Sequence, residues 1–302
     1  MPAYPSPTTL RAALLRTAVS AVLLAPLAAA QAEPIVGLLN GNRLTTFDSA
    51  TPGTASAPVA VTGLQAGANL VGIDLRPSTG VLYGLSQDGT LYTLNAASGA
   101  ASFIGSLSQT LGSGLIGIDF NPVPDLAGAA SLRIFSGSQN LRVDVNGTPV
   151  TNVDTALNGA TSLLAAVAYS NNDRNPATGT SLFGINGGNL YQVTNPNGGV
   201  TALIGSLGVP AFEGAAGFDI SGSTGMSFAS LSVPGQGLYS INLASGAAAL
   251  LGAFDSRLGA VLDITAATGA PAVSAIPEPE TYALMLLGLT AVGWAGRRRS
   301  RR

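Results

Sequence analysis

The sequence contains no cysteine, no histidine and no lysine among its 302 residues. All thirteen of its Lys-or-Arg positions are arginine. Without cysteine the chain has neither disulfides nor thiol chemistry, so packing and backbone pairing must stabilise it. Without histidine and lysine, a serine triad, a zinc site and a Schiff base all lack their usual partners. These absences remove the commonest catalytic constellations and leave carboxylate chemistry as the route open to an enzyme.

Charge of either sign is scarce. Charged residues make up 9% of the chain, against about 25% in an average protein, so Ser, Thr, Asn and Gly must form most of the surface. Between residues 33 and 275 six arginines stand against thirteen acidic residues, a net charge of −7. A surface of this sign does not attract nucleic acid, and we expect no nucleic-acid partner.

The N-terminus has the three parts of a secretory signal peptide. Arg11 and Arg16 precede a short apolar core, "AVSAVLLAPLAAA" at residues 18–30, and Ala30-Gln31-Ala32 forms an A-x-A cleavage site. The core is short for an uncleaved membrane helix. We therefore predict that residues 1–32 are a cleaved signal peptide and that the protein is exported.

The C-terminus, "IPEPETYALMLLGLTAVGWAGRRRSRR", combines two prolines, an apolar run and an arginine cluster. The uncharged run at residues 281–296 predicts a membrane helix about 24 Å long. It begins after Pro279, because proline inside a helix removes a hydrogen bond. The cluster that includes Arg297, Arg298 and Arg299 holds the C-terminus in the cytoplasm by the positive-inside rule.

This tail resembles the PEP-CTERM sorting signal of Gram-negative bacteria, with Pro277-Glu278-Pro279 as the triplet and Ile276 in place of the usual valine. The resemblance implies that an exosortase-type membrane protease cuts near the triplet. The protein would then pass through an inner-membrane intermediate before it reaches the cell surface or the exterior. A plain C-terminal membrane anchor on a periplasmic protein is the alternative.

The middle of the chain is repetitive. "LVGIDLRPSTGVLYGLSQDGTLYTLNAASGAASFIGSL" at residues 70–107 and the segment at residues 215–254 share one template of four strands joined by Gly-rich turns. The first strand of the template recurs at intervals of 44–51 residues, at Asp74, Asp119, Ala168, Asp219 and Asp263. Four strands in each unit of about 40 to 50 residues indicate a β-propeller blade.

The two ends of the repeat array are complementary. Residues 35–64 match strands two to four of the template, and residues 257–267 match only its first strand. A ring in which the last strand completes the first blade resolves both ends and removes exposed sheet edges. We therefore predict an all-β propeller of five four-stranded blades at residues 33–270, followed by the linker and sorting tail at 271–302.

One blade also carries a family resemblance. "GIDLRPSTGVLYGL" at residues 72–85 is similar to the recurring G-[IL]-D-x-R-P-x-x-G-x-L-Y-x-L pattern of the domain of unknown function 4394 family. This resemblance supports the repeats and implies no known activity.

The repeated aspartates are the only candidates for chemistry, because a ring would set Asp74, Asp119, Asp219 and Asp263 around its axis. Two carboxylates about 5 to 10 Å apart can hydrolyse a glycosidic bond, which is the basis of a polysaccharide-active enzyme. An aspartate repeated at one strand position is more typical of a structural acceptor for backbone N–H groups. Ala168 in one repeat favours the same interpretation, so we predict structural aspartates and no catalytic residue.

The loop "YSNNDRNPATG" at residues 169–179 gathers side-chain oxygens of the kind that calcium binds, on Asn171, Asp173 and Asn175. It lacks the alternating carboxylates and the distal Glu of an EF-hand, so we predict an ordinary polar turn and no cofactor, with calcium as the alternative.

Taken together, these features predict an exported propeller at the cell surface or in the extracellular matrix, with a binding or structural role and no assigned activity. An exopolysaccharide is the candidate ligand. The alternatives are the polysaccharide-active enzyme and the membrane-anchored periplasmic protein.

Overall fold

The computed structural model describes residues 32–112, 114–212, 214–231, 233 and 236–266. The chain divides into two compact units, residues 1–30 and 31–302, of which the first lies outside the described residues. The predicted signal peptide apart from Ala32, the Pro-Glu-Pro triplet and the apolar run at 281–296 are likewise outside them. Within the described ranges, no helix is both long and apolar enough to cross a bilayer.

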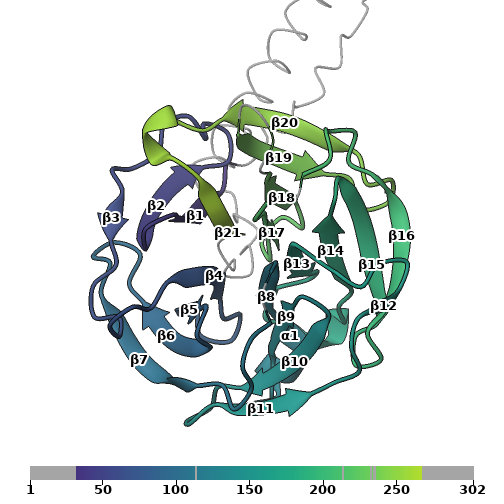
Figure 1. Cartoon of the computed structure of the whole chain (residues 1–302). Coiled ribbons are helices and arrows are strands. Elements are labelled where there is room, and N and C mark those ends of the chain that lie inside the picture. The colour runs from purple at the N-terminus through teal and green to yellow at the C-terminus, as the bar shows by residue number, and fades with distance from the viewer. Residues whose placement is uncertain (1–31, 113, 213, 232, 234–235, 267–302) are drawn as a thin grey trace, which may run out of the picture. The chain divides into compact units, whose positions relative to one another are not determined.

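Five small sheets, antiparallel except for one short outer strand, form a five-bladed β-propeller with one strand of each sheet near the centre of the ring (Figure 1). The first blade contains, from the centre outward, β21 (Val261–Ala266), β1 (Pro34–Leu39), β2 (Arg43–Asp48) and β3 (Val59–Ala60). The second blade contains β4 (Leu70–Leu75), β5 (Leu82–Ser86), β6 (Thr90–Leu94) and β7 (Ala101–Ser106). The third contains β8 (Ile116–Phe120), β9 (Leu132–Ser136), β10 (Gln139–Asp144) and β11 (Val150–Val153).

The remaining two blades follow the same order. The fourth contains β13 (Ala166–Tyr169), β14 (Leu182–Asn186), β15 (Asn189–Asn195), β16 (Val200–Ser206) and β12 (Asn158–Gly159). The fifth contains β17 (Gly217–Ile220), β18 (Ser227–Ser230), β19 (Gly237–Ile241) and β20 (Ala248–Ala253). Short helical turns lie in three connections, α1 (Pro122–Leu126), η1 (Pro176–Thr178) and η2 (Ser256–Leu258).

The predicted ring closure is confirmed. The last strand, β21, pairs antiparallel with β1 in a register that places Ile35 opposite Ala266 and Leu38 opposite Asp263. The innermost strands β21, β4, β8, β13 and β17 then contact one another in that order around the axis, and β17 returns to β21. The two incomplete ends of the repeat array therefore form one complete blade.

The fourth blade has a fifth strand in addition to the four strands of the template. β12 pairs in parallel with the outer strand β16, where Asn158 lies opposite Val200 and Gly159 opposite Thr201. The Thr201 hydroxyl adds a 2.6 Å hydrogen bond to the Asn158 carbonyl. The segment that leaves the third blade thus pairs with the outer strand of the fourth blade before it enters the centre of that blade.

Glycines two residues before three of the repeated aspartates, Asp74, Asp119 and Asp219, allow the central strands to pack closely. A Cβ at Gly217 would lie 2.4 Å from the Ile264 backbone nitrogen of β21, and one at Gly117 would lie 3.1 Å from the Ala166 Cα of β13. A real Cβ atom essentially never comes as close to backbone as it would at Gly217, and few come as close as it would at Gly117, so the Gly-x-Asp spacing of these strands makes a narrow axis. Apolar side chains fill the spaces between blades, as where Tyr83 and Phe120 meet edge to face at 5.0 Å.

Candidate functional site

The repeated aspartates lie together at the axis. Asp74 on β4, Asp119 on β8, Asp219 on β17 and Asp263 on β21, called here the axial carboxylates, are all buried, with at most 8% of their surface exposed. Ala168 occupies the corresponding place on β13 of the fourth blade and is fully buried. The placement predicted from the repeats therefore matches the structure.

Each axial carboxylate accepts a hydrogen bond from the backbone of the next blade's central strand. The donors are Ile73 to Asp263 at 2.9 Å, Phe120 to Asp74 at 2.7 Å, Tyr169 to Asp119 at 3.1 Å and Ala266 to Asp219 at 2.6 Å. Where Ala168 interrupts the series, the buried Asn172 side chain donates instead to the Ile220 carbonyl at 3.3 Å. These contacts support the structural role that the sequence predicts, because they join neighbouring blades through groups that would otherwise lack partners.

Three of these carboxylates crowd one another. Asp74, Asp119 and Asp219 each offer an oxygen atom within 4.8 Å of the others, and the Thr265 hydroxyl oxygen lies 3.0 Å from both Asp74 Oδ1 and Asp219 Oδ2. Burial, reinforced by the neighbouring Asp219, raises the pKa of Asp74 well above its ordinary value. Burial likewise raises the pKa of Asp119 and of Asp263, and that of Asp219 to about 6.

The chemistry open to this cluster is limited by burial. Asp74, Asp119 and Asp219 are at most 2% exposed, so they do not form the open cleft in which a glycosidic bond could lie between two carboxyl groups. Three carboxylates of this spacing could in principle hold a divalent cation. However, Asp74 and Asp219 already accept hydrogen bonds from backbone N–H groups and from Thr265.

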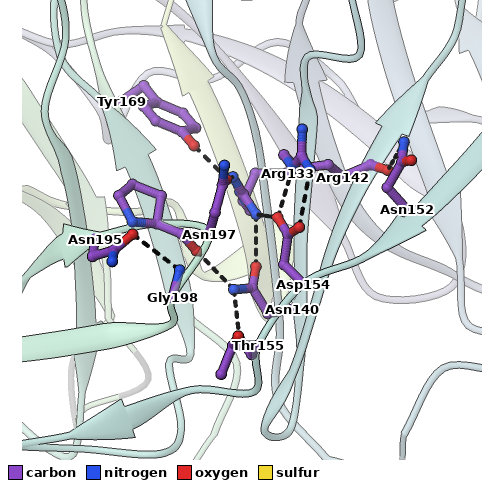
Figure 2. Close-up of polar contacts among 11 residues, drawn as sticks. Arg133, Asn140, Arg142, Asn152, Asp154, Thr155, Tyr169, Asn195, Asn197 and Gly198 are labelled. Carbon is purple, nitrogen blue, oxygen red and sulfur yellow. Dashed lines mark hydrogen bonds and ion pairs between the residues drawn. The ribbon is translucent and has the colours of Figure 1, made fainter.

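A second buried polar group lies between the third and fourth blades, and sequence reasoning missed it. This seam cluster consists of Arg133, Asn140, Arg142, Asp154, Tyr169 and Asn197 (Figure 2). Arg133 on β9 is 2% exposed. Its guanidinium donates to Asn140 Oδ1 at 2.7 Å, Asp154 Oδ2 at 2.6 Å, Asn197 Oδ1 at 2.8 Å and the Tyr169 hydroxyl at 3.3 Å.

Asp154 is the shared anion of the seam cluster. Its Oδ2 accepts from Arg133 and also from Arg142 Nε at 2.6 Å, and its Oδ1 accepts from Arg142 Nη2 at 3.0 Å. Burial alone would raise the pKa of Asp154, but hydrogen bonds and charge from Arg142 and Arg133 outweigh it and lower that pKa. The hydrogen bond to Asp154 raises the pKa of Arg142. The cluster therefore holds two cations and one anion.

A pocket of about 360 Å³ opens beside the seam cluster. Its lining includes Arg133, Arg142 and Tyr169, together with residues of the turn after β15 and of the segment around α1: Asn121, Pro124, Ala130, Ser131, Asn195, Pro196 and Asn197. A separate pocket of about 280 Å³ lies at the other end of the central strands, next to Val71, Ile116 and Leu262, and carries no charged side chain. Of these two pockets, only the first offers strong hydrogen-bond donors.

A signal for the seam cluster is present in the repeats. Arg133 lies opposite Asp119 in the β8–β9 register, and the residues at the same place in the other blades are Tyr83, Phe183, Phe228 and Leu38. An arginine therefore replaces an apolar side chain that packs between blades. Its partners could not be deduced from spacing, because Asp154 and Asn197 follow it by 21 and 64 residues.

The loop proposed as the calcium alternative hydrogen-bonds mainly to itself. Asp173 Oδ1 accepts from the Asn175 backbone at 2.9 Å and the Thr178 hydroxyl at 3.1 Å, while Asn175 Oδ1 accepts from the Ala177 backbone at 3.1 Å. Asn171 adopts a left-handed φ of 56° and donates to the Gly179 carbonyl at 3.2 Å. Two of the candidate ligands thus cap their own turn.

The fold and the site define the class of the protein: a five-bladed β-propeller with buried carboxylates at its axis and a cationic pocket between two blades. The chain belongs to the Domain of unknown function (DUF4394) family, whose match spans residues 43–265. A PEP-CTERM protein-sorting motif matches residues 275–299. That motif implies an exported protein, processing by exosortase-type machinery and a destination in the cell envelope or at the cell surface.

Similar solved structures are distant in sequence. A chain of a nidogen/laminin complex shares 10% identity at a TM-score of 0.43, with 78% of this chain and 98% of that chain covered. A PQQ-bound aldose sugar dehydrogenase from Streptomyces coelicolor shares 17% sequence identity at a TM-score of 0.37, with 60% of this chain and 61% of that chain covered. A structural genomics protein of unknown function from Bacteroides thetaiotaomicron shares 17% sequence identity at a TM-score of 0.46, with 72% of this chain and 57% of that chain covered. No curated protein sequence matches the chain.

Proposed function

We propose that this protein is a binding module, displayed at the cell surface or in the extracellular matrix, that uses the pocket of the seam cluster to hold an exopolysaccharide. The observation that carries the proposal is the pocket itself. Guanidinium, amide and hydroxyl groups from two blades converge on it, and such groups recognise the hydroxyls and ring oxygens of sugars. The proposal needs no chemical step, which suits a chain without histidine, cysteine or lysine.

The proposed route to the surface follows from the two ends of the chain. Residues 1–32 would be removed on export, residues 33–270 would form the binding module, and residues 271–302 would be cut at the sorting signal. Proline disfavours a helix interior and the residue before proline favours an extended backbone, so Pro277 and Pro279 would present the triplet to a membrane protease as an extended segment. The apolar run at 281–296 would hold the chain in the inner membrane until that cut.

The sorting step is tested by replacing Pro277, Glu278 and Pro279 with alanine in the full chain. Export should be unaffected, and the variant should accumulate in the inner membrane with its tail uncut. Intact-mass analysis of the wild-type protein provides the decisive comparison. A mature wild-type species that still ends at Arg302 would contradict the proposal and support the plain membrane anchor.

The binding role is tested by incubating the mature protein, recovered from its native host, with that host's purified exopolysaccharide. Co-sedimentation of the two is the expected result. Absence of binding to the host polysaccharide would contradict the binding role while leaving the sorting result unaffected, because the two experiments depend on different parts of the chain.

A further inference from the structure

We propose that the pocket of the seam cluster binds the carboxylate group of a uronic acid unit in an acidic polysaccharide, with Arg142 as the residue that contacts it. This inference rests on the proposed binding function and specifies its ligand. It depends on three observations: an imbalance of buried charge, a surplus of hydrogen-bond donors, and a departure from the repeat at this one blade.

The charge imbalance arises because two arginines share one aspartate. Arg133 and Arg142 lie directly opposite each other in the β9–β10 register, and Asp154 is the only acidic group that forms an ion pair with either of them within the described residues. Like charges at opposed strand positions repel, and charge removed from water requires compensation. The cluster therefore retains about one positive charge beside the pocket.

Two neighbouring acids, Asp125 and Asp119, do not supply the missing negative charge. Asp125, on α1, is already paired with Arg76 at 2.6 Å and accepts from the Ser131 hydroxyl at 3.1 Å. Asp119 is buried at the axis, where desolvation and the other carboxylates raise its pKa and favour its neutral form. Burial raises the pKa of Tyr169, which therefore stays a neutral phenol. An anionic ligand is thus the simplest source of compensation.

The hydrogen bonds of the pocket leave donors rather than acceptors free. Asn195 Oδ1 accepts from the Gly198 backbone at 3.0 Å, and Asn197 Oδ1 accepts from Arg133. Within the described chain, the Nδ2 groups of both asparagines and Nη1 of Arg142 form no hydrogen bond. Arg142 is also accessible, since 35% of its side chain is exposed. A carboxylate accepts hydrogen bonds and donates none, so it matches a site of free N–H groups.

The departure from the repeat indicates that the positive charge is not part of the blade template. The β5, β14 and β18 residues that correspond to Arg133 are aromatic, and those that correspond to Arg142 are Thr93, Gln192 and Ser240. The other four blades thus have no arginine at the positions that correspond to Arg133 and Arg142. Local violations of an otherwise consistent pattern are expected at functional sites. The pocket volume, about 360 Å³, falls within the range of about 300–1,000 Å³ that is typical of small-ligand sites.

The test measures binding of the mature protein, as recovered from its host, to three probes: polygalacturonate, neutral dextran and poly-L-glutamate. We expect binding to polygalacturonate, none to dextran, and at least about tenfold weaker binding to poly-L-glutamate, whose carboxylates lack the sugar ring. Binding should weaken with added salt, because the interaction pairs opposite charges. Free galacturonate should compete with the polymer, and free galactose should not.

Arg142→Gln should weaken binding to polygalacturonate at least about tenfold. Its fold should persist, because Arg133 and Asp154 remain as a balanced pair. Arg257→Gln is the matched control: it also removes one arginine paired with an aspartate, but at an exposed site outside the pocket. Arg142→Lys, which keeps the charge and loses the planar fork, should bind with intermediate affinity.

The outcomes separate this inference from the function on which it rests. Equal binding of polygalacturonate and dextran, or unchanged binding by Arg142→Gln, would overturn the uronate site while leaving a polysaccharide-binding module intact. Equal competition by galacturonate and galactose in the wild-type protein would overturn it without any substitution. Equal binding of poly-L-glutamate would contradict the requirement for a sugar. Failure of the host's own exopolysaccharide to bind would instead contradict the binding function itself.

Discussion

The axial carboxylates and the seam cluster bury the same chemical group in opposite electrostatic settings. Within the part of the chain that the structure describes, Asp119 at the axis forms no ion pair with an arginine, and burial raises its pKa. In the seam Asp154 accepts from two arginines, and its pKa is lowered. Asp119 is buried and Asp154 is half-buried, although little of the Asp154 carboxyl side chain is exposed. Burial raises the pKa of a carboxyl group at both places, and only the arginine partners of Asp154 reverse that effect.

The two regions also differ in what they leave unsatisfied. At the axis the donors are backbone N–H groups of the next blade, and the carboxylates accept them within the ring. In the seam the donors are the side chains of Arg133, Asn140 and Arg142, and both arginines line a pocket. We interpret the first arrangement as one that joins blades and the second as one that binds a ligand.

The largest expected effect comes from removing β21, which disrupts the axis and leaves the residues of the seam cluster in place. A chain truncated after Asp255 loses Asp263 and Thr265, and also the buried side chains of Val261 and Ile264. Each of these two apolar side chains stabilises the fold by about 1.5 to 3 kcal/mol. A chain truncated after Pro271 should melt like the longer protein. Thermal unfolding of both chains is the measurement, and equally high, equally cooperative melting would contradict the role of β21 in closing the ring.

The next largest effect is expected in the seam, from Asp154→Asn. The substitution leaves Arg133 and Arg142 opposed without an anion, and breaking a buried pair in this way costs about 3 to 5 kcal/mol. Asp255→Asn is the control, because it breaks an exposed ion pair with Arg257 and should change stability by no measurable amount. Urea unfolding at pH 7 compares the two variants. Equal stability of both would show that Asp154 is not the anion on which the seam depends.

A smaller effect is expected at the axis, where the stability of the fold should depend on pH and where removing a carboxyl group should raise stability rather than lower it. A carboxyl group with a raised folded-state pKa binds its proton more tightly when folded, so it stabilises the fold most below its unfolded pKa. That contribution is lost as the pH rises from the unfolded-state pKa through the folded-state pKa. For Asp219 these pKa values are 3.8 and about 6. Stability should therefore decrease as the pH rises from 4 to 7.

Asp119→Asn should reduce this pH dependence and stabilise the protein at pH 7 by about 1 to 3 kcal/mol, because it removes one carboxylate from the crowded group. The asparagine oxygen can still accept the hydrogen bond from Tyr169. Urea unfolding of wild type and variant at pH 4, 5.5 and 7 measures the difference. A wild-type protein that gains stability over this range would show that the axial carboxylates are ionised without penalty.

The axis was predictable from the sequence because it repeats. Asp74, Asp119, Asp219 and Asp263 recur at one position of a four-strand template, and the complementary ends of the array imply closure. The Gly-x-Asp spacing recurs on three of the five central strands, β4, β8 and β17, where it leaves room for the neighbouring strand. The crowding of three carboxylates within 4.8 Å was not predictable, because it depends on the width of the axis rather than on spacing along the chain.

The seam and the rim were not predicted, because both depend on contacts between blades that no repeat describes. Arg133 reaches Asn197 across 64 residues, and the only local signal is an arginine where other blades have an apolar side chain. β12 was missed for a related reason. It is a two-residue strand in a segment of loop-like composition, and it pairs in parallel with a strand some 40 residues later.

The central claim, that the seam cluster binds an acidic sugar, is tested most directly by NMR of the arginine side chains during a titration with tri-galacturonate. The basic residues of this chain are all arginine, and only six of them lie between residues 33 and 275, so few side-chain signals need assignment. We predict that the Nε–H signals of Arg142 and Arg133 shift together and saturate, while those of Arg43 and Arg257 remain in place. Saturable shifts confined to Arg43 or Arg257, or no shift at any arginine, would contradict the claim.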